Sequence, residues 1–479
     1  MIYKGLNIDL VESCSKKRKG LFSQDKTIEC SPTELCLLLF NLSANASEIN
    51  LVQLNFRIDE LDLYTAYDIA LAVENCKRQN IIFIGFSEEL SLEHFLAICF
   101  CDFRICPPLS GILSFSLNFK HFVLNDTNEF FQSVKIGDKK LPLATFASDK
   151  LDESALQREK ELGIEMLKKC IKVISRAIPN KENFKRTYST AVELTENHLL
   201  THVCYEEFLT TNISILKKVS WSYIRINRIN LFSSWSKCQK NFKDKICILE
   251  VNSNSWEELN SLNALRKQIK FLFNLRRING LLVIVNYKGG SYESADRIWC
   301  LLNALKKKFP VYSYIKVAAS SGYCIASAGD RIFINPCGYL GNVGTVLVTP
   351  NYDNIFRKLG VDVINNIASP LENNLTEAGI LKIKAEIAFT LFINRIAESR
   401  KLTTEKVSRI MDGTNFSSTL SVENNFADSE ATLISVLWDL KQSLKKNSQF
   451  IFIKYSSFLI TRILHQVLPI ISLVNRVLK

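Results

Sequence analysis

Apolar runs and amphipathic stretches alternate along this chain, and the same alternation occurs twice. Short runs of apolar residues with β-branched side chains predict strands, and longer stretches with an apolar stripe at helical spacing predict helices. The expected strand–helix–strand elements are 51–56, 63–78 and 81–86 in the first half, and 281–286, 293–308 and 311–315 in the second. Strands that alternate with helices are typical of a parallel sheet with right-handed crossover helices.

The two halves also agree beyond these elements. Residues 92–107 and 321–336 share one layout: a short helix, a polar turn, a strand and a proline. A long helical stretch follows in each half, at 153–176 and 381–400. We therefore predict an α/β protein with two homologous domains in tandem. The expected boundaries are a first domain at 1–215, a basic linker at 216–245, a second domain at 246–437 and a basic amphipathic tail at 438–479.

Composition places the chain among ordinary globular proteins. It has 479 residues, 47% hydrophobic and 23% charged, which excludes an intrinsically disordered chain. There are 14 cysteines but no C-x-x-C pair. Zinc sites usually carry such pairs, so we predict buried free thiols in a reducing compartment, with no metal and no cofactor.

The net charge of +12 is concentrated toward the linker and the tail. Residues 441–479 hold seven Lys or Arg and no acidic residue, with large apolar side chains between them. This favours a helix on an anionic membrane surface rather than a nucleic-acid contact; a helix docked on the protein body is the alternative. We expect neither a signal peptide nor a transmembrane helix, and hence a peripheral membrane or cytoplasmic location.

Candidate chemistry gathers where two strands of the second half end. The strand at 281–286 runs into a loop with Gly289 and Gly290, and the strand at 311–315 leads to Ser320 at the start of a helix. Helix N-termini and glycine turns present backbone N–H groups, which stabilise an oxyanion when a serine attacks a carbonyl. On this evidence alone, the motif favours an ordinary helix-capping serine at Ser320 over a nucleophile.

Three motifs in this region resemble the signal peptide peptidase A (protease IV) family in its long, tandem form. They are NYKGG at 286–290, AASSGY at 318–323 and GNVG at 341–344. The resemblance implies two tandem ClpP/crotonase-like domains. It also implies that Ser320 is the nucleophile and that Gly289 or Gly290, with the N–H of Ser321, forms the oxyanion hole.

In this family the general-base lysine comes from the first half. The segment GDKK at 137–140 matches the family's spacing, which assigns the base to Lys140 and leaves the adjacent Lys139 as a competitor. None of the five histidines has a comparable setting beside Ser320. Ser91 is the first-half counterpart of Ser320, but no glycine loop accompanies it, so we expect a structural role there.

The leading hypothesis is a serine endopeptidase with a Ser–Lys dyad that degrades signal peptides or other apolar peptides at a membrane surface. The family also implies a homo-oligomer. The alternative is a catalytically weak or inactive pseudoprotease that acts as an oligomeric scaffold or peptide-binding protein. Crotonase-type acyl-CoA chemistry is a third possibility, but no acidic pair lies by the glycine loops.

Overall fold

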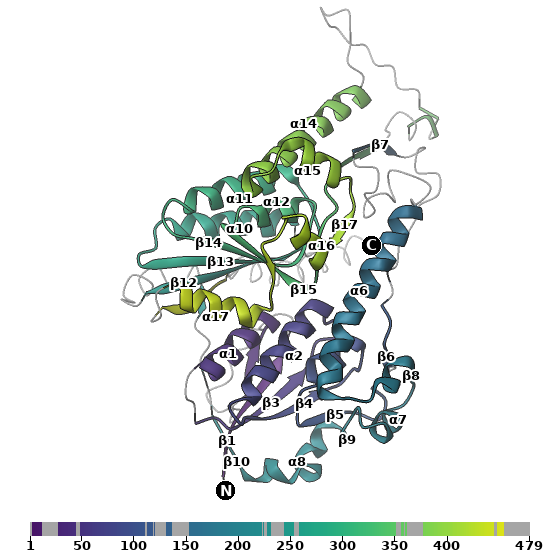
Figure 1. Cartoon of the computed structure of the whole chain (residues 1–479), viewed down its shortest axis with the longest axis vertical. Coiled ribbons are helices and arrows are strands. Elements are labelled where there is room, and N and C mark those ends of the chain that lie inside the picture. Colours follow the sequence, from purple (N-terminus) through teal and green to yellow (C-terminus); the bar gives the residue numbers. More distant parts are fainter. Residues whose placement is uncertain are drawn as a thin grey trace, which may run out of the picture.

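Each half of the chain forms one α/β unit around its own parallel sheet in the computed structural model (Figure 1). The structure describes residues 2–11, 27–44, 48–110, 113–117, 119, 131–136, 153–222, 224, 228–230, 244–252, 258–350, 356–358, 360–361, 377–444 and 448–454. The predicted α/β class with two tandem parallel sheets and crossover helices is confirmed.

The first sheet has the order β10-β1-β3-β4-β5-β9, with β2 paired to β1, and all its strands are parallel. Its strands are β1 (Tyr3–Leu10), β2 (Thr27–Cys30), β3 (Leu51–Phe56), β4 (Ile82–Ser87), β5 (Phe103–Cys106), β9 (His202–Val203) and β10 (Val219–Trp221). The helices of this half are α1 (Pro32–Ala44), α2 (Leu63–Lys77), α3 (Leu92–Ile98), α6 (Glu153–Ala177), α7 (Ala191–Glu196) and α8 (Leu209–Asn212).

The second sheet has the order β11-β19-β12-β13-β14-β15-β17, and β18 also pairs with β15. Its strands are β11 (Arg228–Asn230), β12 (Lys245–Asn252), β13 (Ile278–Tyr287), β14 (Val311–Ala319), β15 (Arg331–Gly341), β17 (Asn415–Ser417), β18 (Ser429–Glu430) and β19 (Gln449–Lys454). All its pairings are parallel except β15 with β17. The helices are α10 (Glu258–Leu272), α11 (Tyr292–Leu305), α12 (Ser321–Ser327), α14 (Glu377–Arg400), α15 (Thr404–Ile410), α16 (Ser418–Glu423) and α17 (Leu433–Ser443).

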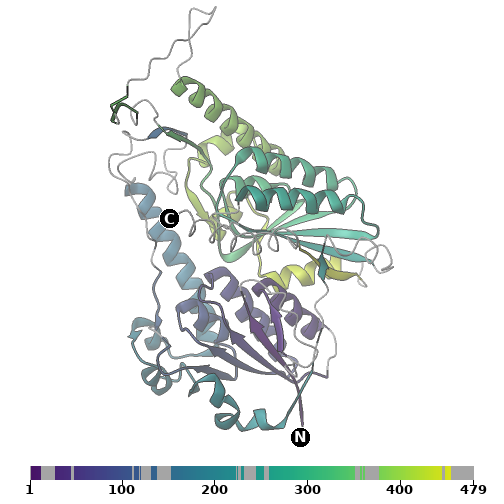
Figure 2. The ribbon, with the colours of Figure 1, turned by 180° about the vertical axis from the view of Figure 1, so that it is seen from behind.

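The two units stack so that helices of the first half cover a face of the second sheet (Figures 1 and 2). Helices α1, α2 and α17 lie between the sheets, and one continuous apolar core joins them to both. This explains why α1 and α2 are buried around most of their circumference rather than along one stripe. The other face of the second sheet forms a separate core with α10, α11, α12 and α14.

The predicted linker and tail both contribute strands. Within 216–245, β10 extends the first sheet and β11 extends the second. Within the tail, β19 inserts between β11 and β12, and its apolar residues are buried. The predicted membrane-surface helix is therefore wrong for Gln449–Lys454, where four consecutive apolar residues form a buried strand of the sheet. Residues 455–479 lie outside the described residues.

Two antiparallel ribbons lie outside the main sheets. One joins β7 (Phe131–Ile136) of the first half to β16 (Thr345–Pro350) of the second, and the other joins β6 (Leu113–Ser114) to β8 (Thr187–Tyr188). The β7–β16 ribbon is a direct backbone connection between the halves. Among the described residues, no helix is both long and apolar enough to cross a membrane.

Candidate active site

Ser320 occupies a sharp turn between the buried strand β14 and helix α12. Its φ is 52° and its ψ is −125°, a conformation that residues other than glycine rarely adopt. Three backbone hydrogen bonds hold it. Ser320 N–H donates to the Gly341 carbonyl (2.7 Å), and the Ser320 carbonyl accepts from the N–H groups of Tyr323 (2.9 Å) and Cys324 (3.4 Å). A strained strand-to-helix turn of this kind presents the hydroxyl of a nucleophilic serine.

The equivalent serine of the first half has none of this strain. Ser91 has φ −94° and ψ 177°, and its hydroxyl caps helix α3 by accepting a bond from His94 N–H. The same hydroxyl lies 3.0 Å from His94 Nδ1 and 2.7 Å from a Glu93 carboxylate oxygen. Ser91 and Ser320 hold equivalent positions in the two halves, so their backbone conformations can be compared directly. Of these two serines, Ser320 alone stands in a strained turn.

The glycine loop after β13 lies directly against this serine. Gly289 has φ 127°, and a Cβ built there would sit 3.2 Å from Ser320 Cβ and 3.8 Å from its Oγ. Gly290 follows it in the same loop. Here glycine is required both by the backbone conformation and by the close approach of the serine. The structure therefore places Gly289 against Ser320, and Gly290 is the next residue of the same loop.

The start of α12 packs equally closely on the same loop. A Cβ at Gly322 would lie 2.3 Å from the Tyr287 carbonyl oxygen, so the helix can approach β13 only because this residue has no side chain. Ser321 lies in the first turn, where backbone N–H groups have no acceptor within the helix. Its hydroxyl is buried and has no hydrogen-bond partner among the described residues, a condition that is uncommon away from functional sites.

The predicted base, Lys140, and its competitor, Lys139, lie outside the described residues. The strand that leads to them is described, however, and it ends at Ile136. Ile136 pairs with Thr345 of β16, only three residues after Asn342 of the GNVG motif. The chain therefore enters the GDKK segment from beside the second half.

A buried lysine near Ser320 was not singled out from the sequence. Lys316 lies four residues before Ser320 on β14, is 4% exposed, and donates from Nζ to Thr65 Oγ1 at 2.9 Å. Burial by itself lowers the pKa of Lys316, but the nearby carboxylates, Asp62, Asp68 and Glu250, outweigh it and raise the pKa. Lys316 therefore stays protonated and does not suit the role of a general base.

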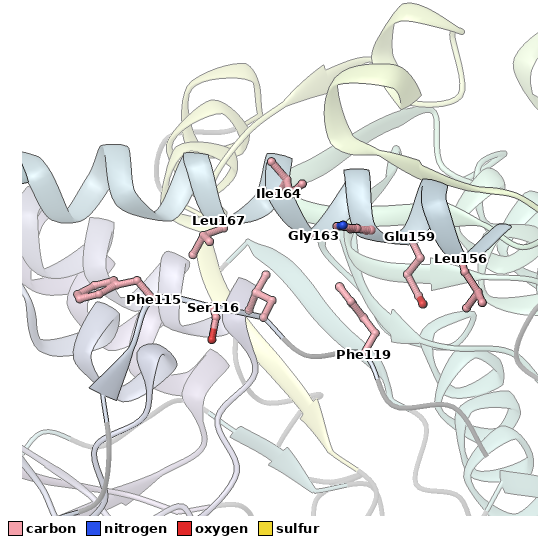
Figure 3. Close-up of a pocket in the computed structure, with 10 residues that line it drawn as sticks. Phe115, Ser116, Phe119, Leu156, Glu159, Gly163, Ile164 and Leu167 are labelled. Carbon is pink, nitrogen blue, oxygen red and sulfur yellow. The ribbon is translucent and has the colours of Figure 1, made fainter. Parts of the chain in front are cut away.

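A separate apolar pocket of about 400 Å³ lies on the first half, along one face of α6. Figure 3 shows Leu156, Glu159 and Leu167 pointing from α6 toward the segment that carries Phe115 and Phe119. The pocket is lined by residues of the first half alone and does not include Ser320. Among the described residues, no group of three or more His, Cys, Asp or Glu side chains could hold a metal ion.

The described cysteines are free, and all but Cys300 are buried, as expected for apolar thiols. Burial is the main cause that raises the pKa of Cys324, in helix α12 just after Ser320, above its usual value. A thiol in this state is a poor nucleophile, because the reactive form is the thiolate. This leaves the chemistry of the turn to the serine hydroxyl.

Comparison with known proteins agrees with this geometry. Residues 303–447 match the profile described as "Peptidase family S49". A protein of Enterococcus faecium named "Putative signal peptide peptidase SppA" is 30% identical over 210 residues, which cover 42% of this chain and 60% of that protein. "Serine protease SPPA, chloroplastic" of Arabidopsis thaliana is 19% identical over 383 residues, which cover 72% of this chain and 56% of that protein.

The chain thus spans about 60% of the length of the first of these curated relatives. Among solved structures, that of a ClpP1 mutant from Listeria monocytogenes matches 40% of this chain and 91% of its own, with 16% identity and a TM-score of 0.28. A score this low carries no argument about the fold, which the sheet topology establishes. The predicted resemblance to signal peptide peptidase A is confirmed by the family profile and the named relatives.

Proposed function

Since residues 303–447 match the profile of peptidase family S49, we propose that the protein is a serine endopeptidase with Ser320 as its nucleophile. The observation that carries this proposal is the strained turn at Ser320, with Gly289 packed against it. Strain of this kind persists only where the surrounding structure maintains it, and it concentrates at functional sites. The relaxed Ser91 shows that the fold does not require it.

In the proposed reaction, Ser320 Oγ attacks the carbonyl carbon of a peptide bond, and the carbonyl oxygen becomes an oxyanion. Backbone N–H groups of Gly289 or Gly290 and of Ser321 would stabilise that charge, an effect worth about 3 kcal/mol for each donor. The base returns the proton from Ser320 to the amine nitrogen, the C–N bond breaks, and the amine leaves an acyl-enzyme on Ser320. Water, deprotonated by the same base, then attacks the ester carbon, and the C–O bond to Ser320 breaks to release the carboxylic acid and restore the serine hydroxyl. Both steps need a base that removes a proton from the attacking oxygen.

We assign that base to Lys140, with Lys139 as the competing assignment. The β7–β16 ribbon supports the choice, because it brings Ile136 beside the strand that follows the GNVG motif. The proposed base follows Ile136 by four residues in the sequence, and four extended residues span at most about 14 Å. To act as a base at neutral pH, the lysine must lower its pKa from about 10.4 by about three units.

The proposed substrates are signal peptides or other apolar peptides, as the name of the Enterococcus faecium relative indicates for that protein. A homo-oligomer is part of the same proposal. The alternative, a pseudoprotease that binds peptides without cleaving them, is supported by the replacement of the family's Ser-Pro by Tyr287 and Lys288 in the glycine loop. Tyr287 is fully buried and Lys288 is exposed, so a charge stands at the edge of the site.

Labelling with a fluorophosphonate probe tests the proposal. The wild-type protein should be labelled, Ser320→Ala should not, and the matched variant Ser91→Ala should be labelled like wild type. Lys140→Ala should lose labelling and cleavage of an unfolded apolar polypeptide, whereas Lys139→Ala should keep both. If the folded wild-type protein is neither labelled nor able to cleave, the pseudoprotease alternative is correct; if only the Lys139 variant is inactive, the base is Lys139.

We further propose a peripheral membrane contact through the basic residues of 441–479. Because β19 is part of the second sheet, the informative truncation ends at Lys454 and keeps that strand. The full chain should co-sediment with anionic liposomes, and the truncated chain should not. Equal binding by both chains would remove residues 455–479 from the proposal.

A further inference from the structure

One helix of the first half touches all three strands that carry the serine site of the second half. Helix α2 contributes Tyr64, Thr65 and Asp68 to this contact. The strands are β13, which leads to Gly289; β14, which ends beside Ser320; and β15, which ends at Gly341, the acceptor for Ser320 N–H. The halves are therefore joined by specific polar bonds behind the site, not by apolar packing alone.

The bonds to β14 are the closest to the serine. Thr65 Oγ1 accepts a hydrogen bond from Lys316 Nζ at 2.9 Å. Both oxygens of Asp68 accept from the Tyr314 hydroxyl, at 2.7 Å and 2.9 Å. Because a buried charge is costly unless it is hydrogen-bonded, the Lys316 ammonium favours the one arrangement of α2 and β14 in which Thr65 reaches it.

The flanking strands are held by the same helix. Asn335 Nδ2, on β15, donates to an Asp68 carboxylate oxygen at 3.1 Å and to the Tyr64 carbonyl at 3.1 Å. The Tyr64 hydroxyl hydrogen-bonds the side chain of Asn286, on β13, three residues before Gly289. Tyr64, Asp68 and Asn335 are all buried, so water does not readily replace these bonds.

These bonds bear on the strain at Ser320. A residue with φ 52° relaxes unless its neighbours prevent it, and the neighbours of Ser320 are the ends of β14 and β15. Those strands are tied to each other by their ladder, and to the rest of the protein by Thr65 and Asp68. Removal of one of these hydrogen bonds from α2 should thus let the Ser320 turn move while the sheet stays folded.

We infer that α2 of the first half is a positioning element for the serine site, with Thr65 acting on Ser320 through Lys316. This inference rests on the proposed peptidase function for its kinetic consequence, but the restraint on the turn is a property of the fold. On this inference the first half would supply the base and would also set the geometry of the nucleophile. Thr65 and Lys316 are positioning residues, because neither touches the reacting atoms.

A second contact between the halves provides a matched control. Thr419, on α16, accepts a hydrogen bond from Lys169 Nζ of α6, also at 2.9 Å. Lys169 additionally binds Glu430 and Ser418 in this cluster. The donor and acceptor types are the same as at Thr65, a lysine and a threonine hydroxyl from opposite halves, but Thr419 is exposed and its lysine lies on α6 rather than on a strand that ends beside Ser320.

The experiment compares Thr65→Val, Thr65→Ser and Thr419→Val in the full chain. The first readout is the rate constant of fluorophosphonate labelling, measured well below the unfolding temperature. Thr65→Val should reduce it about tenfold or more, as expected when a reacting group is displaced by a fraction of an ångström. Thr65→Ser keeps the hydroxyl and should restore the rate, and Thr419→Val should leave it unchanged.

The second readout is hydrogen–deuterium exchange of peptides that contain residues 316–324. Exchange of the Ser320 amide should accelerate in Thr65→Val but not in Thr65→Ser or Thr419→Val. If Thr65→Val does not fold, Tyr64→Phe, which removes only the hydroxyl that reaches Asn286, takes its place with the same expectation. If Thr65→Val, or Tyr64→Phe in its place, is labelled and exchanges at the wild-type rates, the inference is overturned and the peptidase proposal stays intact. Absence of labelling in wild type would refute the peptidase proposal, and exchange would still decide the positioning.

Discussion

Replacement of Ser320 by glycine should stabilise the protein while it abolishes activity. The residue stands at φ 52° and ψ −125°, which is the conformation of the first central residue of a type II′ turn and favours glycine. Ser320→Ala removes the hydroxyl but keeps the Cβ that makes this conformation unfavourable. The difference in free energy of unfolding between Ser320→Gly and Ser320→Ala therefore isolates the backbone strain, since neither variant has the hydroxyl.

The magnitude follows from two opposing terms. Release of a strained backbone conformation contributes about 1–3 kcal/mol. Glycine loses more chain entropy on folding than alanine, which costs about 0.5–1 kcal/mol. The net expectation is that the free energy of unfolding of Ser320→Gly exceeds that of Ser320→Ala by about 1 kcal/mol, within a range of about 0 to 2.5 kcal/mol.

Urea-induced unfolding, followed by circular dichroism, measures this difference. Thr390, an exposed residue inside helix α14, provides the matched control, because its backbone is helical. There the order should reverse, with glycine less stable than alanine by about 1 kcal/mol. If glycine is no better than alanine at position 320 while the control behaves as expected, the turn is not strained, and the argument for a nucleophile there loses its main support.

Three further outcomes are expected. Gly289→Ala places a Cβ 3.2 Å from Ser320 Cβ in a residue with φ 127°, so the rate of fluorophosphonate labelling should fall at least tenfold (about 1.4 kcal/mol) while the circular dichroism spectrum stays native. Labelling at the wild-type rate would contradict the packing of the loop on the serine. Gly322→Ala places a Cβ 2.3 Å from the Tyr287 carbonyl oxygen, so the free energy of unfolding should fall by about 3 kcal/mol, which urea titration would measure. Burial raises the pKa of Asp68 to about 6, so its contribution to stability is present below pH 3.8 and is lost as the pH rises toward 6. Relative to Asp68→Asn, wild type should lose about 2 kcal/mol between pH 4 and pH 7, and parallel stability curves for the two proteins would refute the raised pKa.

Much of the fold could be predicted because its elements are local. The strand predicted at 51–56 is β3, and the helix predicted at 63–78 is α2 within one residue. A buried parallel strand is a continuous run of apolar residues, and a crossover helix has apolar residues at helical spacing. The type of each element can therefore be predicted from its own residues. The location of Ser320 at a strand end beside a glycine loop followed from the same patterns.

The tail shows where local patterns are insufficient. Gln449–Lys454 carries four consecutive apolar residues within a basic stretch, and so short an apolar run does not by itself distinguish a helix from a strand. Its strand conformation depends on β11 and β12, which lie far away in the sequence and supply the hydrogen bonds on both edges. A strand of this kind is defined by its neighbours, and no window of its own sequence contains them.

What the sequence by itself determined is the set of repeated elements and the residues that can do chemistry at their ends. What only the tertiary structure decided is the strain at Ser320, the ribbon that carries Ile136 beside Thr345, and the anchoring of Lys316 by Thr65. The physical reason is the range of the interactions. Periodicity reflects contacts within a few residues. The turn at Ser320, by contrast, is held by Gly341 and packed on by Gly289, which belong to other strand ends of the sheet, and the buried Lys316 ammonium is held by Thr65, 251 residues away in sequence.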